Sequence, residues 1–327
     1  MTPEQLKDFS NYFPNTPLSK LDDPWLQQFN VSVVIKRDDL IDSRISGNKF
    51  RKLKHALIRY QAGDYSGIVS FGGPWSNHLH ATSAVTEKLA IPLVAIVRGE
   101  QPKSPSDTLN DIVESGANVQ YVSRVLYREM RHFAEQGKLE QHPFIEPWSD
   151  YMIIPEGGCS EDALAGVAEI ISEDDESFDA IYLACGTGAT LAGVSVGLGD
   201  NPSTKLVGIA ALKGGNSLQE NVQRLLQGQA QPYTNNWMID KNFHFGGFAK
   251  TSPELIDFMN QLYKRTGLVT EPVYTGKTLF ALYQHIEQGQ FQPASKIMMI
   301  HTGGLQGLRG FKDKGLFACE ASLPYDS

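Results

Sequence analysis

The sequence predicts an α/β fold built on a mostly parallel sheet, and three observations support this prediction. The chain has 327 residues and is 41% hydrophobic, which suffices to bury the core of two domains or of one large α/β unit. Short apolar runs alternate with longer segments of helical apolar spacing, and glycine-rich turns follow several of the runs. This alternation is typical of βαβ units, in which ligands bind at the carboxyl ends of the strands.

The predicted elements alternate along both halves of the chain. Strands are expected over 31–35, 67–71, 93–97, 119–123, 151–154, 180–184, 206–211 and 297–300. Helices are expected from Lys49 onward and over 77–89, 105–115, 124–136, 161–172, 190–197, 217–226, 253–266 and 277–288. Residues 228–250 are expected to be irregular, and a crossing between domains is expected near 142–158.

Composition limits the class of protein. The net charge of -8 and the isoelectric point near 5.5 argue against a nucleic-acid partner. Cys159, Cys185 and Cys319 form no CxxC pair and are odd in number, so a reducing compartment is expected and the protein is predicted to be cytoplasmic. The N-terminal residues lack a signal pattern, and no apolar run approaches the roughly 18 residues that a membrane span needs. No membrane role is predicted.

The stretch 46–52 puts a lysine near the start of a predicted helix, which Ser46 or Asn48 would cap. The first turns of this helix carry Lys49, Arg51, Lys52 and Lys54. Cations at the positive end of a helix dipole cost stability, and they disfavour one another's protons. The pKa of Lys49 should therefore fall toward the value that a Schiff-base nucleophile needs. The alternative is a solvated basic face that binds nothing.

A second candidate is the glycine-rich turn 186–190, which follows a buried strand and opens a helix. Its residues are Gly186, Thr187, Gly188, Ala189 and Thr190. Several backbone N–H groups and a helix dipole would point at one spot, as in a phosphate site. A nicotinamide site is a weak alternative, because the third glycine of the dinucleotide motif and its acidic residue are missing. The glycines could also serve only a tight turn.

The turn 72–78 repeats this geometry, with Ser76 and Asn77 at the capping position of a helix. Such a helix start can receive a carboxylate. His78 and His80 are two residues apart and diverge on a helix, so no metal site is predicted. Further along, Gly276-Lys277-Thr278 imitates the end of a Walker A loop, but Glu271 stands where the first glycine should be.

Five motifs in order resemble one family over nearly the whole chain. They are Asn48-Lys49, Ser76-Asn77-His78, the 186–190 turn, Pro272-Val273-Tyr274 and His301-Thr302-Gly303-Gly304. The sequence resembles the 1-aminocyclopropane-1-carboxylate deaminase and D-cysteine desulfhydrase family of pyridoxal-phosphate enzymes. The resemblance implies fold type II, the tryptophan synthase β-like fold, with two open, mostly parallel sheets flanked by helices. It also implies a large cofactor-binding domain of residues 1–45 plus 157–327, a small inserted domain of residues 46–156, and a homodimer.

The resemblance assigns roles to single residues. Lys49 would form the Schiff base with pyridoxal 5'-phosphate, Ser76 would receive the substrate carboxylate or carry a proton, and Tyr274 would act in acid–base chemistry. The cofactor-binding residues would be Lys49, Asn77, Gly186, Thr187, Gly188, Ala189, Thr190 and Thr302, with Asn77 on the ring hydroxyl. The substrate-binding residues would be Trp75, Ser76, Asn77, His78, Phe248 and Thr275.

Two positions indicate which reaction to expect within the family. Cyclopropane deaminases are expected to have Glu and an apolar residue where this chain has Thr275 and Thr302. A hydroxyl beside the pyridine nitrogen leaves it largely unprotonated, which suits α,β-elimination of a good leaving group, as in D-cysteine desulfhydrases. Three departures are Phe248 for a second tyrosine, Trp75 for a smaller polar residue and Ala189 for a glycine.

These departures leave alternatives open. The substrate could be another amino acid with a β-leaving group, or the reaction could be opening of the cyclopropane ring. From other classes, the chain could bind the cofactor without turnover, or it could be a nucleotide-binding oxidoreductase.

Overall fold

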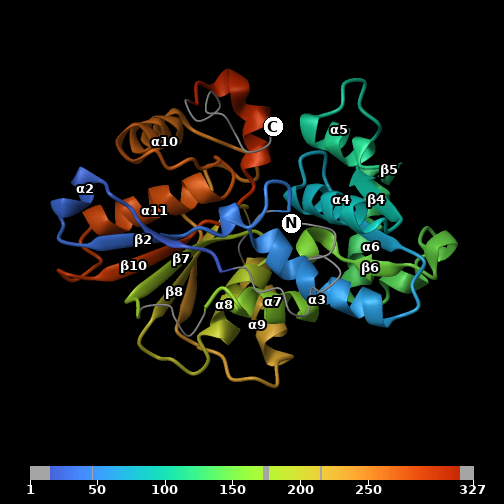
Figure 1. Ribbon diagram of the computed structural model, residues 1–327, viewed down its shortest axis with the longest axis horizontal. Helices are drawn as coiled ribbons and strands as arrows, with labels where there is room; N and C mark the ends of the chain where they lie inside the picture. Colours follow the sequence, from blue (N-terminus) through green and yellow to red (C-terminus); the bar gives the residue numbers. More distant parts are fainter. Residues whose placement is uncertain (1–14, 46, 172–176, 214–215, 317–327) are drawn as a thin grey trace.

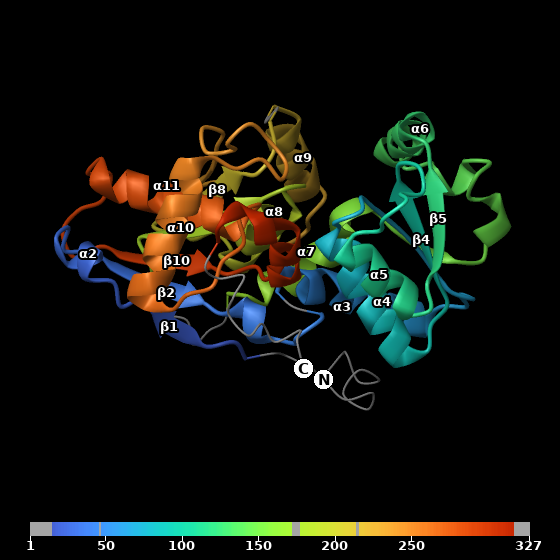
Figure 2. The ribbon, with the colours of Figure 1, turned by 90° about the horizontal axis from the view of Figure 1, so that it is seen from above.

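The computed structural model describes residues 15–45, 47–171, 177–213 and 216–316, so Ser46 and Cys319 lie outside the described residues. Two sheets, of six and four strands, make up the described part of the chain, and Figures 1 and 2 show them side by side. Helices flank both sheets. The mostly parallel α/β class predicted from the sequence is therefore confirmed.

The larger sheet has the strand order β1-β2-β10-β7-β8-β9. Its strands are β1 (Leu18–Lys20), β2 (Ser32–Lys36), β10 (Lys296–Ile300), β7 (Ala180–Cys185), β8 (Lys205–Ala210) and β9 (Trp237–Asp240). All neighbouring pairs are parallel except β1 with β2. The central strand β7 is buried along its whole length, because helices cover both faces of the sheet.

The helices on the two faces of this sheet belong to two apolar clusters. One face packs on α7 (Glu161–Ala168), α8 (Ala189–Gly197) and α9 (Asn216–Gln227). The other face packs on α2 (Pro24–Gln27), α10 (Pro253–Thr266) and α11 (Thr275–Glu287). The chain leaves β10 through residues 301–304 and ends its described part in the 3₁₀ segment η5 (Leu305–Lys314).

The smaller sheet has the order β5-β4-β3-β6, with every pair parallel. Its strands are β3 (Ile68–Gly72), β4 (Leu93–Arg98), β5 (Asn118–Val122) and β6 (Met152–Ile154). The helices α3 (Asn48–Ala62) and α4 (Asn77–Leu89) pack on one face with α5 (Asp107–Glu114), and α6 (Arg124–Glu135) covers the other.

The helix that carries Lys49 lies between the two sheets, against α7 (Figure 2). A Cβ atom at Gly166 of α7 would come 2.0 Å from the carbonyl oxygen of Arg51, so only a glycine permits this approach. The smaller sheet is built from residues 68–154, and the larger one from residues on both sides of this range. We propose the division into 1–45 plus 157–327 and 46–156 on this basis.

Most predicted elements are confirmed to within two residues, and the exceptions are short. Residues 228–250 were expected to be irregular but contain β9, and β1 and α2 were not predicted. The predicted helix 161–172 ends at Ala168, where Glu169 follows as its C-cap. No helix in the described ranges is long and apolar enough to cross a membrane.

Candidate active site around Lys49

Four helix starts and one loop converge on Lys49. The helices α3, α4, α8 and α11 begin here, and residues 302–304 follow the carboxyl end of β10. Asn48 Nδ2 donates to Thr190 Oγ1 at 2.8 Å, which joins α3 to α8. A Cβ atom at Gly186 would come 3.3 Å from the ring of Tyr274, so the turn before α8 touches the start of α11. We call this group the Lys49 site.

The start of α3 is capped differently from the prediction. Gly47 is the N-cap, with φ 65° and no side-chain hydrogen bond, and a Cβ there would come 2.1 Å from the carbonyl oxygen of Thr302. Asn48 is the first helical residue, so it does not cap the helix. Its Oδ1 instead accepts a hydrogen bond from Lys49 Nζ at 2.8 Å. The close approach to residue 302 and this hydrogen bond position the lysine.

The pKa of Lys49 is well below its usual value. The main cause is the loss of water around the amine, since the residue is partly buried. The charge of Lys52 lowers the pKa further, and the charge of Glu271 opposes the shift. The direction agrees with the prediction for a Schiff-base nucleophile.

The alternative of a solvated basic face is wrong, because the neighbouring cations are buried. Arg51 forms two hydrogen bonds with the carboxylate of Asp38, at 2.9 and 3.1 Å. Lys54 donates to Glu169 at 2.7 Å. The sequence had suggested that Arg51 and Lys54 also lower the pKa of Lys49. This prediction is wrong, because carboxylates compensate the charges of both residues. Lys52 is the neighbouring cation on α3 that acts on Lys49.

Lys52 and Thr187 flank the glycine turn at Gly157. Lys52 is 4% exposed, and its Nζ donates to the Gly157 carbonyl at 3.3 Å. A Cβ atom at Gly157 would come 2.9 Å from the Thr187 side chain, and the buried Thr187 hydroxyl has no partner among the described residues. A buried cation and an unpartnered hydroxyl near a helix start fit an anion such as phosphate. Lys52 was not predicted as a site residue, although it lies one turn after Lys49.

The 186–190 turn has the conformation that the prediction requires. Gly188 is the N-cap of α8 with φ 88°, and a Cβ there would come 2.5 Å from Val222. Ala189 opens α8 without a positive φ, so an alanine fits this position.

Ser76 is the N-cap of α4, as predicted, and its Oγ accepts the Leu79 N–H at 3.1 Å. Its hydroxyl proton can therefore point to a ligand. The side-chain Oδ1 of Asn77 accepts from Gln306 Nε2 at 2.7 Å, and a Cβ at Gly304 would come 2.3 Å from the Asn77 amide. Gln306 was not predicted from the sequence, where it carries no motif.

His78 is a buried, neutral imidazole. Ser70 Oγ donates to the Ile154 carbonyl at 3.0 Å, so it accepts the proton of His78 Nε2 at 2.9 Å. The other ring nitrogen, Nδ1, has no partner among the described residues. Burial, with the charges of Lys49 and Lys52, lowers the pKa of His78 to about 3. Its role in substrate binding stays a prediction.

A charged network joins α4 and α5 to the C-terminal segment η5. Asp111 contacts His80 Nε2 at 3.0 Å and pairs with Arg309 through both of its oxygens. Trp75 lies nearby, since a Cβ at Gly310 would come 3.1 Å from its ring. His80 therefore serves this network, while His78 lies next to Ser70.

Tyr274 lies at the start of α11, beside two predicted substrate residues. Burial, together with the charges of Glu271 and Glu156, raises the pKa of Tyr274, so its phenol stays protonated. Phe248 packs edge-on against the Tyr274 ring, with ring centroids 6.2 Å apart. Thr275 is fully buried, and its hydroxyl accepts the Glu271 N–H at 3.0 Å.

Glu271 is an unpredicted residue that shapes this turn. Its buried carboxylate accepts the N–H groups of Val273, Tyr274 and Thr275 at 2.7 to 2.8 Å. The pKa of Glu271 is nevertheless raised by burial, against the effect of these hydrogen bonds. Because its charge also acts on Lys49, Glu271 couples the α11 start to the lysine.

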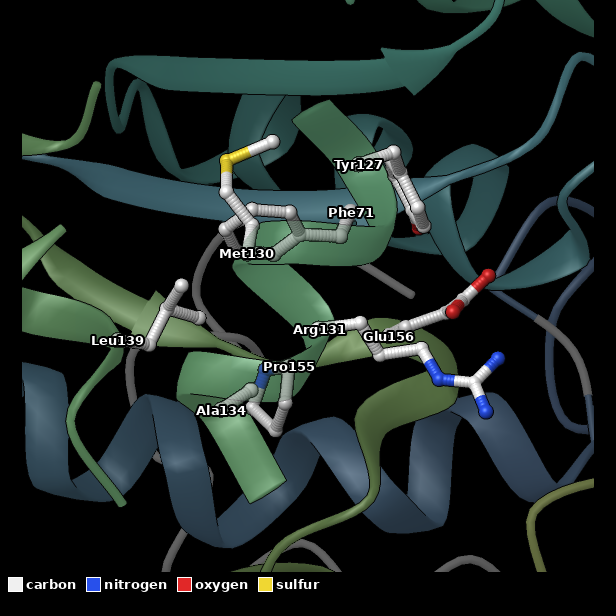
Figure 3. Close-up of a pocket in the computed structure, with 8 residues that line it drawn as sticks. All are labelled: Phe71, Tyr127, Met130, Arg131, Ala134, Leu139, Pro155 and Glu156. Carbon is white, nitrogen blue, oxygen red and sulfur yellow. The ribbon is translucent and has the colours of Figure 1, made fainter. Parts of the chain in front are cut away.

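A small cavity lies between β3, α6 and residues 155–156 (Figure 3). Its lining residues are Phe71, Tyr127, Met130, Arg131, Ala134, Leu139, Pro155 and Glu156. None of the predicted site residues is among them. The site is therefore identified by the polar side chains that meet around Lys49, and not by this cavity.

Known proteins are similar to this chain over most of its length. The pyridoxal-phosphate dependent enzyme family matches residues 10–303. A putative 1-aminocyclopropane-1-carboxylate deaminase of Pyrococcus horikoshii is 29% identical over 296 residues, which cover 88% of this chain and 89% of that protein. A mitochondrial bifunctional D-cysteine desulfhydrase/1-aminocyclopropane-1-carboxylate deaminase of Arabidopsis thaliana is 30% identical over 311 residues, or 90% and 77% of the two chains. A crystal structure of an ACC deaminase homologue superimposes with a TM-score of 0.75 at 27% identity and covers 96% of this chain and 98% of its own.

The residues of the Lys49 site fit pyridoxal 5'-phosphate. Lys49 is an amine of lowered pKa, as a covalent bond to an aldehyde requires. Lys52 and the unpartnered Thr187 hydroxyl would supply the cationic and polar partners that the phosphate of the cofactor needs. The resemblance seen in the sequence and the fold type II class are confirmed. The chain belongs to the pyridoxal-phosphate dependent enzyme family, with pyridoxal 5'-phosphate as its cofactor.

Proposed function

We propose that the protein is a lyase that catalyses α,β-elimination on a small amino acid, with D-cysteine as the first candidate substrate. The reaction would convert D-cysteine and water into pyruvate, ammonia and hydrogen sulfide. The observation that carries this proposal is the amine of Lys49, which Asn48 holds and whose pKa is lowered by burial and by Lys52. The name of the Arabidopsis relative, which includes D-cysteine desulfhydrase, supports the substrate class.

The cofactor, when bound, supplies an electron sink for the charge that develops on the substrate α-carbon. Lys49 would hold it covalently. Lys52 Nζ, the Thr187 hydroxyl and the N–H groups at the start of α8 would hold its phosphate. Asn77 and Thr302 would contact the ring.

The proton transfers follow from the protonation states of the site. Lys49 Nζ, whose pKa is lowered, can accept the proton of the substrate α-carbon. The helix start at Ser76 and Asn77 would bind the substrate carboxylate. The Ser76 hydroxyl, which accepts from Leu79, would donate a hydrogen bond to this carboxylate. Tyr274, whose raised pKa keeps its phenol protonated, could donate a proton to the leaving sulfur.

Ring opening of 1-aminocyclopropane-1-carboxylate is the second candidate. The name of the Pyrococcus relative favours it. The hydroxyl of Thr275 argues against it, because this neutral side chain accepts the Glu271 N–H and cannot replace a carboxylate at the pyridine nitrogen.

The decisive experiment measures keto acid, ammonia and sulfide released by the cofactor-loaded protein from a panel of amino acids. The panel holds D- and L-cysteine, D- and L-serine, β-chloro-D-alanine and the cyclopropane substrate. We expect turnover of D-cysteine that is lost in Lys49→Ala and kept in the exposed control Lys103→Ala. Elimination by Lys49→Ala at the wild-type rate, or turnover of the cyclopropane substrate alone, would overturn the proposal.

We further propose a cytoplasmic homodimer. The described cysteines, Cys159 and Cys185, are both free thiols, which suits a reducing compartment. The dimer follows from the resemblance to the family. Light scattering of the purified protein tests it, and a monomeric mass with bound cofactor would contradict it.

A further inference from the structure

Lys277 is a fully buried cation that the proposed reaction does not use. It lies on α11, one turn after Tyr274, and none of its surface is exposed. Burial lowers the pKa of Lys277 to about 8, against the opposing charge of Glu271. A buried ammonium is tolerated only when hydrogen bonds satisfy it, so its partners indicate its purpose.

Three backbone carbonyls surround the ammonium of Lys277. Its Nζ donates to the His244 and Gly247 carbonyls at 2.9 Å each and to the Ala211 carbonyl at 3.4 Å. An ammonium has three donors, so this set satisfies it. Lys277 therefore ties the turn at 244–247 and the end of β8 to the helix that begins at Tyr274.

The turn held by Lys277 has a backbone that needs such support. Phe245 and Ala249 have φ of 52° and 55°, and Gly246 and Gly247 have φ of 96° and 125°. Left-handed conformations of residues with a side chain persist where surrounding contacts impose them. Besides Lys277, the turn has local hydrogen bonds at His244, whose Nδ1 accepts the Gly246 N–H at 2.8 Å.

The turn places Phe248 beside Tyr274 and leaves Phe248 exposed. Its ring stands edge-on to Tyr274, and 43% of the residue remains accessible. Leu212, directly after the third carbonyl that Lys277 binds, is 38% exposed. Each of the two backbone segments that the ammonium joins thus presents an exposed apolar side chain. Such surface beside an acid–base phenol is best covered by an apolar part of a ligand.

We propose that Lys277 is a positioning residue that holds Phe248 beside Tyr274, and that Phe248 selects amino acids whose β-leaving group carries an apolar substituent. S-alkyl and S-arylmethyl cysteines are the class in question. For S-benzylcysteine, the α-C–H and β-C–S bonds break, the thiolate takes a proton, and water releases the rest as pyruvate and ammonia, with benzyl mercaptan as the third product. This inference rests on the proposed elimination.

The test compares S-benzylcysteine with cysteine, both as D-enantiomers, on the cofactor-loaded enzyme. The readouts are KM and kcat for keto-acid release and, independently of turnover, Kd from the change in the cofactor's visible absorbance. We expect wild-type KM and Kd to be at least about tenfold lower for S-benzylcysteine. This preference is the ratio of the value for cysteine to the value for S-benzylcysteine. Phe248→Ala should reduce this ratio about tenfold, and Phe248→Tyr should reduce it less.

Lys277→Met should reduce the same ratio, and the double variant with Phe248→Ala should lose no more than either single variant. Additive losses would mean that Lys277 acts only on general stability, and would overturn its positioning role. Lys277→Gln, which keeps two donors, replaces Lys277→Met if the latter does not fold. An unchanged Kd ratio in Phe248→Ala would overturn the selectivity. If no amino acid is turned over, the elimination itself fails, while the Kd ratios still decide the role of Phe248.

Discussion

Asn48 and Thr190 join α3 and α8, two of the four helices that begin at the Lys49 site, through a hydrogen bond of 2.8 Å from the amide nitrogen to the hydroxyl. The same amide accepts from Lys49 through its oxygen. One side chain therefore sets the distance between the lysine and the turn proposed to hold phosphate.

Replacing Asn48 by alanine should weaken cofactor binding. A lost buried hydrogen bond costs about 1–3 kcal/mol, so the Kd for pyridoxal 5'-phosphate should rise about tenfold in an absorbance titration. Gln120→Ala is the matched control, since it removes an exposed hydrogen bond to Asn118. Equal affinities for Asn48→Ala and the wild type would refute the bridging role.

Removing Arg51 should destabilise the fold strongly. Arg51→Met leaves the buried carboxylate of Asp38 without its cation, which costs about 3–5 kcal/mol in the free energy of unfolding. Arg131→Met breaks an exposed pair with Glu135 and should cost less than about 0.5 kcal/mol. Urea unfolding measures both, and similar losses in the two variants would contradict the buried ion pair.

Removing Lys52 should raise the pKa of Lys49. Lys52→Met deletes the cation that disfavours the Lys49 proton, so the reaction of Lys49 with an amine reagent should show a midpoint at higher pH. Cofactor affinity should fall as well, by about tenfold for one lost charge-assisted contact. Lys103→Met, at an exposed position, is the control. An unchanged midpoint for Lys49 in Lys52→Met would exclude this electrostatic coupling.

His78 should make stability fall in mild acid. Its folded pKa of about 3 lies below the unfolded value of about 6.5, so between these values only the unfolded chain binds the proton. The free energy of unfolding should therefore fall by about 1 kcal/mol between pH 6 and pH 5 on account of His78. The raised pKa of Glu271 has the opposite effect on the free energy of unfolding, and this effect is the same in the wild type and in a variant at His78.

The His78→Gln variant isolates this contribution. Its free energy of unfolding, measured with urea at pH 6 and pH 5, should fall by about 1 kcal/mol less than that of the wild type. An equal fall in the two proteins would contradict this prediction, because it would mean that folding leaves the pKa of His78 unchanged.

The fold could be predicted where apolar runs are long and flanked by turns. Strands such as β4 and β7 are buried on both faces and read as continuous apolar segments, and Ser76 caps its helix at the predicted position. The strands β1 and β9 have three and four residues with polar members, and only their pairing with β2 and β8 makes them strands. No local pattern carries that information.

The site could be predicted in its motifs but not in its electrostatics. Lys49, Ser76 and the 186–190 turn follow local rules of helix starts. The partners Asp38 and Glu169 of the buried cations lie 13 and 115 residues away from Arg51 and Lys54, so the charges looked unpaired in the sequence. Glu271 and Lys277 were seen only as a failed nucleotide motif, because their partners are backbone groups that only the folded chain brings close.

The central claim, that Lys49 is the residue bound to the cofactor, is tested most directly by borohydride reduction of the cofactor-loaded protein followed by peptide mapping. Reduction makes the lysine–cofactor bond permanent, so the modified peptide identifies the lysine. We expect a single labelled peptide that carries the modification on Lys49, and no label in Lys49→Ala. Modification of Lys52, Lys277 or any other lysine in the wild-type protein, with Lys49 unlabelled, would contradict the account.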